Sequence, residues 1–119
     1  MTEGPDPRSF LPLAPQDFQV LLGLAVGARH AYGLAASVAA EHDAVRLELG
    51  SLYRILARLT ADGLIEETNP PRDEQRPDPR RRYYRLTQFG RRVAAAETDR
   101  LEALLQAARQ HRLVPSRRK

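Results

Sequence analysis

The chain has 119 residues, a length typical of one domain, and its 42% hydrophobic content is enough for a single core. It has no cysteine, which excludes disulfides, thiolate metal sites and thiol catalysis. The formal net charge is +4, and every basic residue except Lys119 is an arginine, whose planar fork suits phosphates and guanine edges. The N-terminus has no signal pattern and no apolar run could span a bilayer, so we expect a cytoplasmic protein with no membrane partner.

The first helix is expected over residues 15–27, after a flexible, proline-interrupted lead-in over residues 1–14. Pro15 suits the first helical position, Asp17 suits the first turn, and Gly27 is expected to end the helix. Apolar residues cover much of its circumference, which predicts burial on more than one side: Phe18, Val20, Leu21, Leu22, Leu24, Ala25 and Val26.

A second helix is expected over residues 31–42, after a short connection at 28–30. It is rich in alanine, and its larger apolar residues are Tyr32, Leu34 and Val38. Small side chains allow neighbouring helices to approach closely, so we interpret it as a supporting helix. Residues 43–48 are expected to form the turn into the next helix.

The third helix is expected over residues 49–62 and is strongly two-sided. One face is apolar at i, i+3, i+4 and i+7: Leu52, Ile55, Leu56 and Leu59. The opposite face carries hydroxyls and cations: Ser51, Tyr53, Arg54 and Arg58. Gly63 supplies a C-terminal stop. Such a helix can bury one side and offer the other to a polyanion, and the alternative is a surface helix with solvated arginines.

Two short strands are expected next, over residues 64–68 and 82–86, joined by a long exposed loop over residues 69–80. Period-two alternation predicts that Tyr84 and Leu86 face inward and that Tyr83 and Arg85 face outward. Three helices followed by a hairpin is the order of a winged helix-turn-helix domain. The predicted fold class is therefore mainly α with a small β-hairpin, and the predicted DNA-binding domain covers residues 15–87.

A long helix is expected over residues 88–109, with Thr87 as its N-cap. Its apolar seam extends beyond what a small domain can cover, so we predict a dimerisation region over residues 88–110, formed by Val93, Leu101, Leu104, Leu105 and Ala108. The alternative is that the seam packs back on its own domain. Residues 111–119 are expected to be a basic tail.

A block of arginines without any acidic residue runs over residues 79–96: Arg80, Arg81, Arg82, Arg85, Arg91 and Arg92. This pattern indicates an electrostatic footprint for nucleic acid. For Arg91 and Arg92, a solvated basic face is the alternative.

Several ordered motifs together resemble the PadR family of bacterial transcriptional regulators. They are His30-Ala31-Tyr32-Gly33, then Leu49-Gly50-Ser51-Leu52-Tyr53-Arg54, then Leu59 with Asp62-Gly63-Leu64-Ile65, and finally residues 81–87 with Gly90. The chain departs from the family at Ala31, where glycine is usual, and at Leu49, where proline is usual. The resemblance implies a dimeric winged-helix repressor of the short form, with one C-terminal helix, that often responds to a small molecule.

In a helix-turn-helix protein the second helix of the motif enters the major groove, which here is the third helix of the chain. We therefore predict DNA contacts from Ser51, Tyr53, Arg54 and Arg58. Arg54 is the candidate for bidentate contact with guanine, and Tyr53 is the candidate for a phosphate. The arginines Arg80, Arg81 and Arg82 lie at the wing, where they could meet the backbone or the minor groove.

No cofactor, metal or catalytic motif is evident, because the three histidines are scattered and no glycine-rich phosphate loop or nucleophile elbow occurs. The predicted function is a sequence-specific DNA-binding regulator, a repressor that binds an inverted repeat of double-stranded DNA as a homodimer. A small apolar or aromatic effector, enclosed by the first and last helices between protomers, is predicted to release it. The alternative is a winged-helix module for protein–protein contact without specific DNA binding.

Overall fold

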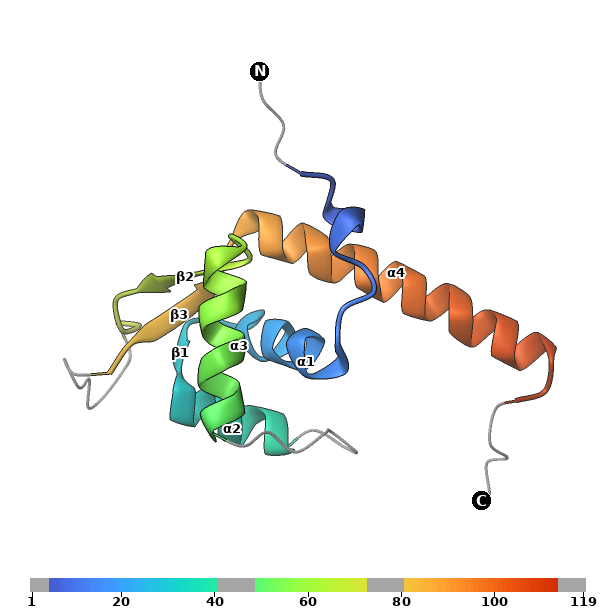
Figure 1. Cartoon of the computed structure of the whole chain (residues 1–119). Helices are drawn as coiled ribbons and strands as arrows, with labels where there is room; N and C mark the ends of the chain where they lie inside the picture. The colour runs from blue at the N-terminus through green and yellow to red at the C-terminus, as the bar shows by residue number, and fades with distance from the viewer. Residues whose placement is uncertain (1–4, 41–48, 73–80, 114–119) are drawn as a thin grey trace.

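The computed structural model describes residues 5–40, 49–72 and 81–113 (Figure 1). The expected turn over residues 43–48, most of the loop over 69–80, Arg80 and the end of the basic tail lie outside the described residues. In the described parts, three helices and a small sheet form the body of the domain, and a long C-terminal helix crosses it and runs on past it (Figure 1).

The core is built where the first three helices meet: α1 (Pro15–Leu24), α2 (Ala31–Ala40) and α3 (Leu49–Ala61). All four residues of the predicted α3 stripe, Leu52, Ile55, Leu56 and Leu59, are buried. They pack in one cluster with Leu34 of α2 and with Val20, Leu21 and Leu24 of α1. The helical period of the apolar residues therefore predicted the central packing of the domain correctly.

The first helix is shorter and less buried than its composition predicts. It starts at Pro15 as expected but ends at Leu24, and residues 25–27 form a turn. Leu22 is 47% exposed and Val26 is 77% exposed, so the prediction of burial on more than one side is wrong for these two residues. The reason is geometric, because Leu22 lies off the face of α1 that meets the core and Val26 lies in the turn after the helix.

The sheet has three antiparallel strands in the order β1–β3–β2 and not the two of a simple hairpin. The two expected strands are β2 (Ile65–Thr68) and β3 (Tyr83–Leu86), which pair from Ile65 opposite Leu86 to Thr68 opposite Tyr83. The additional strand β1 (Arg29–His30) lies in the connection before α2 and pairs with the other edge of β3.

This third strand changes the environment of Tyr83, which was predicted to face outward. His30 lies opposite Tyr83 in the β1–β3 register, and its ring packs edge-on against the Tyr83 ring with centroids 5.2 Å apart. Tyr83 is consequently buried and not exposed to solvent, although it lies on the other face of the strand from core-packed Tyr84 as the alternation predicts, and Arg85 is exposed as expected. In a two-stranded wing the outward side of Tyr83 would face solvent, whereas here the His30 ring of β1 covers it.

The chain turns from α3 into β2 and again from β3 into α4 (Gln88–Gln110). Hydrogen bonds join these two turns. Gly63 has φ +79°, the left-handed conformation expected at the helix stop. The Thr87 hydroxyl accepts a hydrogen bond from the Gly90 N–H as the predicted N-cap, and it donates to the Gly63 carbonyl at 2.7 Å. These contacts lock the start of α4 to the end of α3.

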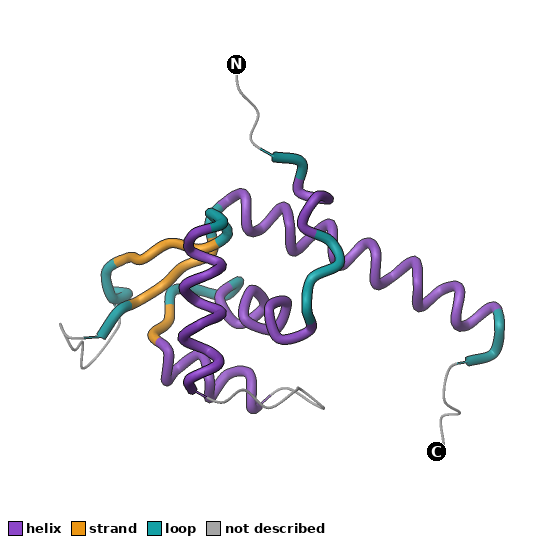
Figure 2. Tube along the Cα trace, viewed as in Figure 1, coloured by secondary structure: helices purple, strands orange, loops and turns teal. Residues whose placement is uncertain are grey.

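The described part of the lead-in packs against α4. A 3-10 helix, η1 (Pro7–Phe10), lies over α4 in the tube view (Figure 2). Phe10 packs edge-on against Phe89 of α4, with ring centroids 5.5 Å apart, and Leu11 and Leu13 pack against the core. Sequence polarity alone did not predict this docking, because only a few apolar side chains carry it.

The N-terminal half of α4 belongs to the domain, and this changes the role of one predicted dimer residue. Val93 is fully buried in the core cluster, so it does not lie on an exposed seam. Glu97 is also buried, and its carboxylate accepts two hydrogen bonds from Arg100 at 2.8 Å. That contact lowers the pKa of the Glu97 carboxyl below its ordinary value, although burial acts in the opposite direction.

The C-terminal half of α4 projects beyond the body of the domain (Figure 1). Its leucines are about half exposed, at 39% for Leu101, 54% for Leu104 and 44% for Leu105. At 3.6 residues per turn, Leu101, Leu104 and Ala108 continue the face on which Val93 and Glu97 are buried.

Among the described residues, no helix is long and apolar enough to cross a membrane.

Candidate nucleic-acid interface

The exposed face of α3 carries the predicted contact residues in an accessible arrangement. Tyr53 is half exposed and Arg54 is exposed, while Ser51 is partly buried. A guanidinium nitrogen of Arg54 donates to the Ser51 hydroxyl at 3.2 Å, one turn earlier on the same helix. The side chain of Arg54 is therefore directed toward the N-terminal end of α3, which is the end that approaches base edges in helix-turn-helix proteins.

Arg58, one turn further along α3, is held in a different way. Its Nη2 donates to both carboxylate oxygens of Asp17 in α1, at 2.6 and 2.7 Å. The Asp17 side chain is 12% exposed and the Arg58 side chain 50% exposed. The pair joins α1 to α3, so the Arg58 guanidinium is engaged within the domain although half of the side chain is exposed.

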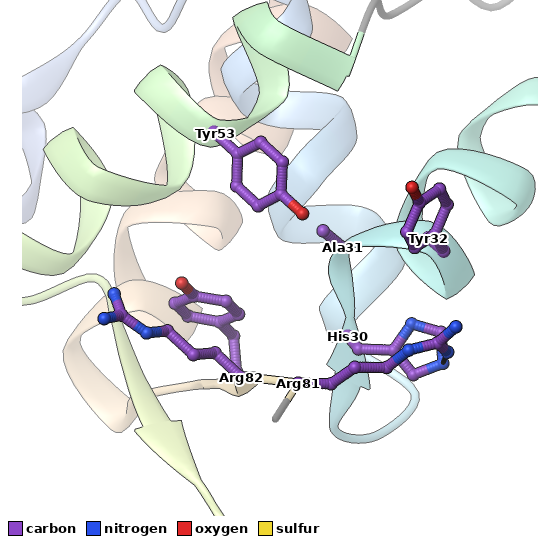
Figure 3. A pocket seen from close by; sticks show the side chains of 7 residues that line it. His30, Ala31, Tyr32, Tyr53, Arg81 and Arg82 are labelled. Carbon is purple, nitrogen blue, oxygen red and sulfur yellow. Dashed lines mark hydrogen bonds between the residues drawn. The ribbon is translucent and has the colours of Figure 1, made fainter. Parts of the chain in front are cut away.

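A cavity of about 280 Å³ opens between α2, α3 and the start of β3 (Figure 3). Its described lining combines aromatic and cationic side chains and contains no acidic residue: His30, Ala31, Tyr32, Tyr53, Arg81, Arg82 and Tyr84. The Tyr53 hydroxyl points from α3 toward Ala31 at the start of α2 (Figure 3). The structure thus brings together Tyr53, Arg81 and Arg82, three residues predicted separately from the helix and the wing.

The two wing arginines flank this cavity with different partners. Arg82 is exposed and its Nη1 lies 3.8 Å from a carboxylate oxygen of Glu67 on β2. Arg81 extends toward α2, where its Nη1 lies 3.0 Å from Nε2 of His30 and its guanidinium carbon lies 5.4 Å from the centre of the Tyr32 ring. This distance is within the range of a cation–π contact.

His30 is itself fixed from the other side. Its Nδ1 accepts a hydrogen bond from the Gly33 N–H at 3.0 Å, within the first turn of α2. Figure 3 shows His30, Tyr32 and the end of Arg81 gathered at one side of the cavity. The sequence singled out His30 and Tyr32 as part of a motif, but gave them no part in a site, because Arg81 is 51 residues from His30.

The sequence of this domain matches the family model described as the transcriptional regulator PadR-like family over residues 20–96. This match runs from α1 through the sheet and into the core-packed half of α4. The chain belongs to the PadR-like family. It is therefore a DNA-binding transcriptional regulator, and the family is one of regulators and not of enzymes.

Solved structures share the fold of this PadR-like chain at low sequence identity. A PadR family regulator from Clostridium difficile R20291 is 20% identical with a TM-score of 0.69, and the match covers 82% of this chain and 98% of that one. A PadR family regulator from Eggerthella lenta is 24% identical with a TM-score of 0.63, covering 92% and 87% of the two chains.

A third similar structure is that of BpsR from Bordetella bronchiseptica, which is described in terms of regulation of its DNA binding by 6-hydroxynicotinic acid. It is 22% identical with a TM-score of 0.60, and the match covers 80% of this chain and 64% of that one. The search of curated proteins found no match.

Proposed function

We propose that this PadR-like chain is a repressor that binds duplex DNA as a homodimer at an inverted repeat. The observation that carries the proposal is the convergence of Tyr53 from α3 with Arg81 and Arg82 from the wing on one cavity without described acidic lining. When a recognition helix enters the major groove, the DNA backbone borders it on both sides. Arginines set beside that helix are then in position to meet phosphates.

The residue roles follow from this orientation. Arg54, directed toward the N-terminal end of α3, reads a guanine with its planar fork. Tyr53 donates its hydroxyl to a phosphate, Ser51 supports Arg54, and Arg81 and Arg82 bind the backbone. Arg80 is proposed as a further wing contact.

The dimer is proposed to form through the projecting half of α4. Leu101, Leu104 and Leu105 are exposed on the described chain, and Leu101 and Leu104 continue a helix face that is buried further toward the N-terminus. A second copy covering this face would bury the apolar surface symmetrically. Two-fold symmetry then requires an inverted repeat, with half-site centres about 34–36 Å apart.

Release by a small apolar or aromatic molecule is part of the same proposal. Exposed Leu22 of α1 and Val26 of the turn that follows it, together with the α4 leucines, provide apolar surface that could enclose a ligand between protomers. A ligand releases DNA only through its differential affinity for the two states, commonly worth about 1–3 kcal/mol. The test is a screen of phenols, dyes, cationic drugs and 6-hydroxynicotinic acid, and compounds that change neither thermal stability nor operator affinity would count against an effector.

The experiment for DNA binding begins with genomic fragments captured by the full chain, which define an operator by their shared sequence. Affinity for that operator and for a scrambled duplex is then measured from about 50 to 200 mM salt, a range over which phosphate contacts are strongly weakened. We expect tighter binding to the operator and a linear fall of log affinity with log salt. Equal and salt-independent affinity for both duplexes would favour a protein-interaction module instead.

A further inference from the structure

The cavity between α2, α3 and the wing is lined by a buried tyrosine that the proposed residue roles leave unused. Tyr84 is only 7% exposed, and it belongs to the core cluster. We propose that the Tyr84 hydroxyl donates a hydrogen bond to one backbone phosphate of the bound DNA, beside Tyr53 and Arg82. This inference rests on the proposed DNA binding and adds a residue that the strand alternation assigned only to the inward face.

The first support is the state of the Tyr84 hydroxyl. Among the residues that the structure describes, it has no hydrogen-bond partner, although buried tyrosine hydroxyls usually find one. Within the same residues, the only side-chain polar atom that is both fully enclosed and unpaired is Oε1 of Gln19. The Tyr84 hydroxyl is therefore accessible, and the cavity that Tyr84 lines provides the access. A phenylalanine would fill the core as well, so the hydroxyl is the part of this residue that is available to a ligand.

The second support is the rigid placement of Tyr84. Strand β3 is the central strand of the sheet, and Tyr84 lies opposite Arg29 of β1 and Glu67 of β2. Its backbone is thus held between two strands while its side chain packs in the core. A donor that is already fixed loses little conformational entropy when it binds, which favours tight contact with a phosphate.

The third support is that other hydrogen-bond donors meet at the same cavity. The Tyr53 hydroxyl points from α3 toward Ala31, and Arg82 lines the cavity from just before β3 (Figure 3). The Arg82 side chain is 73% exposed and lies 3.8 Å from an equally accessible carboxylate of Glu67. Such a surface ion pair is weak, so Arg82 can turn to a phosphate.

The size and chemistry of the cavity suit this ligand. At roughly 30 Å³ for each water molecule, a volume of about 280 Å³ has room for a phosphate group and part of its sugar. Tyrosine hydroxyls and arginine guanidinium groups are both common donors to DNA phosphate oxygens. Hydrogen bonds to a charged acceptor are stronger than those between neutral groups.

The test is Tyr84→Phe, which removes only the hydroxyl. Because that hydroxyl has no partner among the described residues, the variant should keep the wild-type midpoint of urea unfolding. We expect its affinity for operator and scrambled duplex to fall alike, by about tenfold for each protomer, since a phosphate carries no sequence information. The slope of log affinity against log salt should not change, because tyrosine is neutral. Arg82→Ala should lower the magnitude of that slope by about 1.8 for a dimer that loses two charged contacts.

Replacing single operator phosphates by uncharged methylphosphonates locates the contact. One replacement in each half-site should weaken the wild type strongly, and Tyr84→Phe should lose part of that sensitivity at the same phosphate. Tyr53→Phe, at a half-exposed position where folding is not at risk, should lose sensitivity at this phosphate too. Tyr32→Phe is the matched control, because it removes the same group from a 57% exposed ring and should keep the full sensitivity.

The outcomes distinguish the two proposals. If the wild-type chain binds neither duplex in a salt-dependent way, DNA binding itself fails. If the wild type binds but Tyr84→Phe has the same affinity, or if Tyr32→Phe shows the same loss, the Tyr84 contact is wrong while DNA binding stands.

A free phosphate group is the other source of the same chemistry. Inorganic phosphate, added at constant ionic strength, should not distinguish the unfolding temperatures of the wild type and Tyr84→Phe. If it stabilises only the wild type and no methylphosphonate position depends on Tyr84, the assignment to the DNA backbone is overturned.

Discussion

Asp17 of α1 and Arg58 of α3 form a salt bridge in which Nη2 of the arginine lies 2.6 Å and 2.7 Å from the two carboxylate oxygens. The residues are 41 positions apart in sequence. The bridge connects the first helix, which exposes Leu22, to the helix proposed to read DNA. The DNA contact of Arg58 stays a prediction. The structure also gives Arg58 a role inside the domain, as the partner of Asp17.

We expect Arg58→Ala to lower the free energy of unfolding by about 1.5–3 kcal/mol, because it removes both charge-assisted hydrogen bonds and leaves the largely buried Asp17 carboxylate without its partner. Asp17→Asn should cost less, since half-exposed Arg58 can return to water. Urea denaturation of both variants measures these differences. If the bridge is the whole role of Arg58, the salt dependence of DNA binding is unchanged in Arg58→Ala, and a reduced slope would assign it a phosphate contact.

Gly90 in the first turn of α4 is required by close packing. A Cβ atom built there lies 1.9 Å from the Leu64 carbonyl oxygen, which is backbone and cannot rotate away. We expect Gly90→Ala to destabilise the chain by about 1–3 kcal/mol or more, measured by chemical denaturation. Gly50→Ala is the matched control, because no described residue lies within 4 Å of a Cβ atom built at that position of α3. This variant should be neutral or stabilise by up to about 1 kcal/mol, and equal loss in both variants would contradict the packing argument.

The Glu97–Arg100 pair predicts that the stability of the folded chain falls at low pH. Hydrogen bonds from Arg100 lower the pKa of the Glu97 carboxyl in the folded chain. An acid with a lowered folded pKa contributes stability above its unfolded pKa, and that contribution is lost as the pH falls through the folded pKa. Thermal unfolding followed from pH 7 downward should show this loss below the ordinary value of about 4.5. Glu97→Gln, which cannot ionise, should show a smaller decrease over the same range than the wild type.

Features that depend on local periodicity were predicted well from the sequence. The α3 stripe, the Thr87 cap and the left-handed Gly63 each follow from residues within one or two helical turns. The position at which α4 leaves the domain was not predicted. Buried Val93 and exposed Leu104 lie on one apolar face with the same helical period, so the sequence does not distinguish them. Only the three-dimensional extent of the domain decides where that face becomes exposed.

The parts of the candidate site that the sequence did not predict are contacts between residues far apart in the chain. The third strand is only two residues long, too short to produce an alternating pattern, yet it buries Tyr83 and positions His30. The contacts of Arg58 with Asp17 and of Arg81 with His30 span 41 and 51 residues. The sequence identified the arginines, and the fold was needed to identify their partners.

The exposed leucines of α4 predict that the chain is a dimer. Replacing Leu101 and Leu105 together by aspartate should convert the full chain from dimer to monomer, because two charges would be buried in an apolar interface. Ala103→Asp with Gln106→Asp adds the same charge on exposed positions of the opposite side of α4 and should leave the dimer intact. Sedimentation velocity at micromolar concentration makes the comparison. A wild-type chain that sediments as a monomer would rule out this interface, and the substitutions avoid truncating α4, which would remove Val93 from the core.

Arg54 gives the prediction that most directly tests base recognition. It is exposed on α3, and its guanidinium is directed by Ser51 toward the end of the helix that approaches the bases. Bidentate contact with guanine is worth about 1–3 kcal/mol of discrimination, so Arg54→Ala should weaken operator binding by that amount per contact and relax preference at one position of each half-site. Ser51→Ala should have a smaller effect of the same kind, because it removes only the support. Binding to a set of operators with single base changes measures both, and an unchanged preference in Arg54→Ala would show that another side chain of α3 reads the sequence.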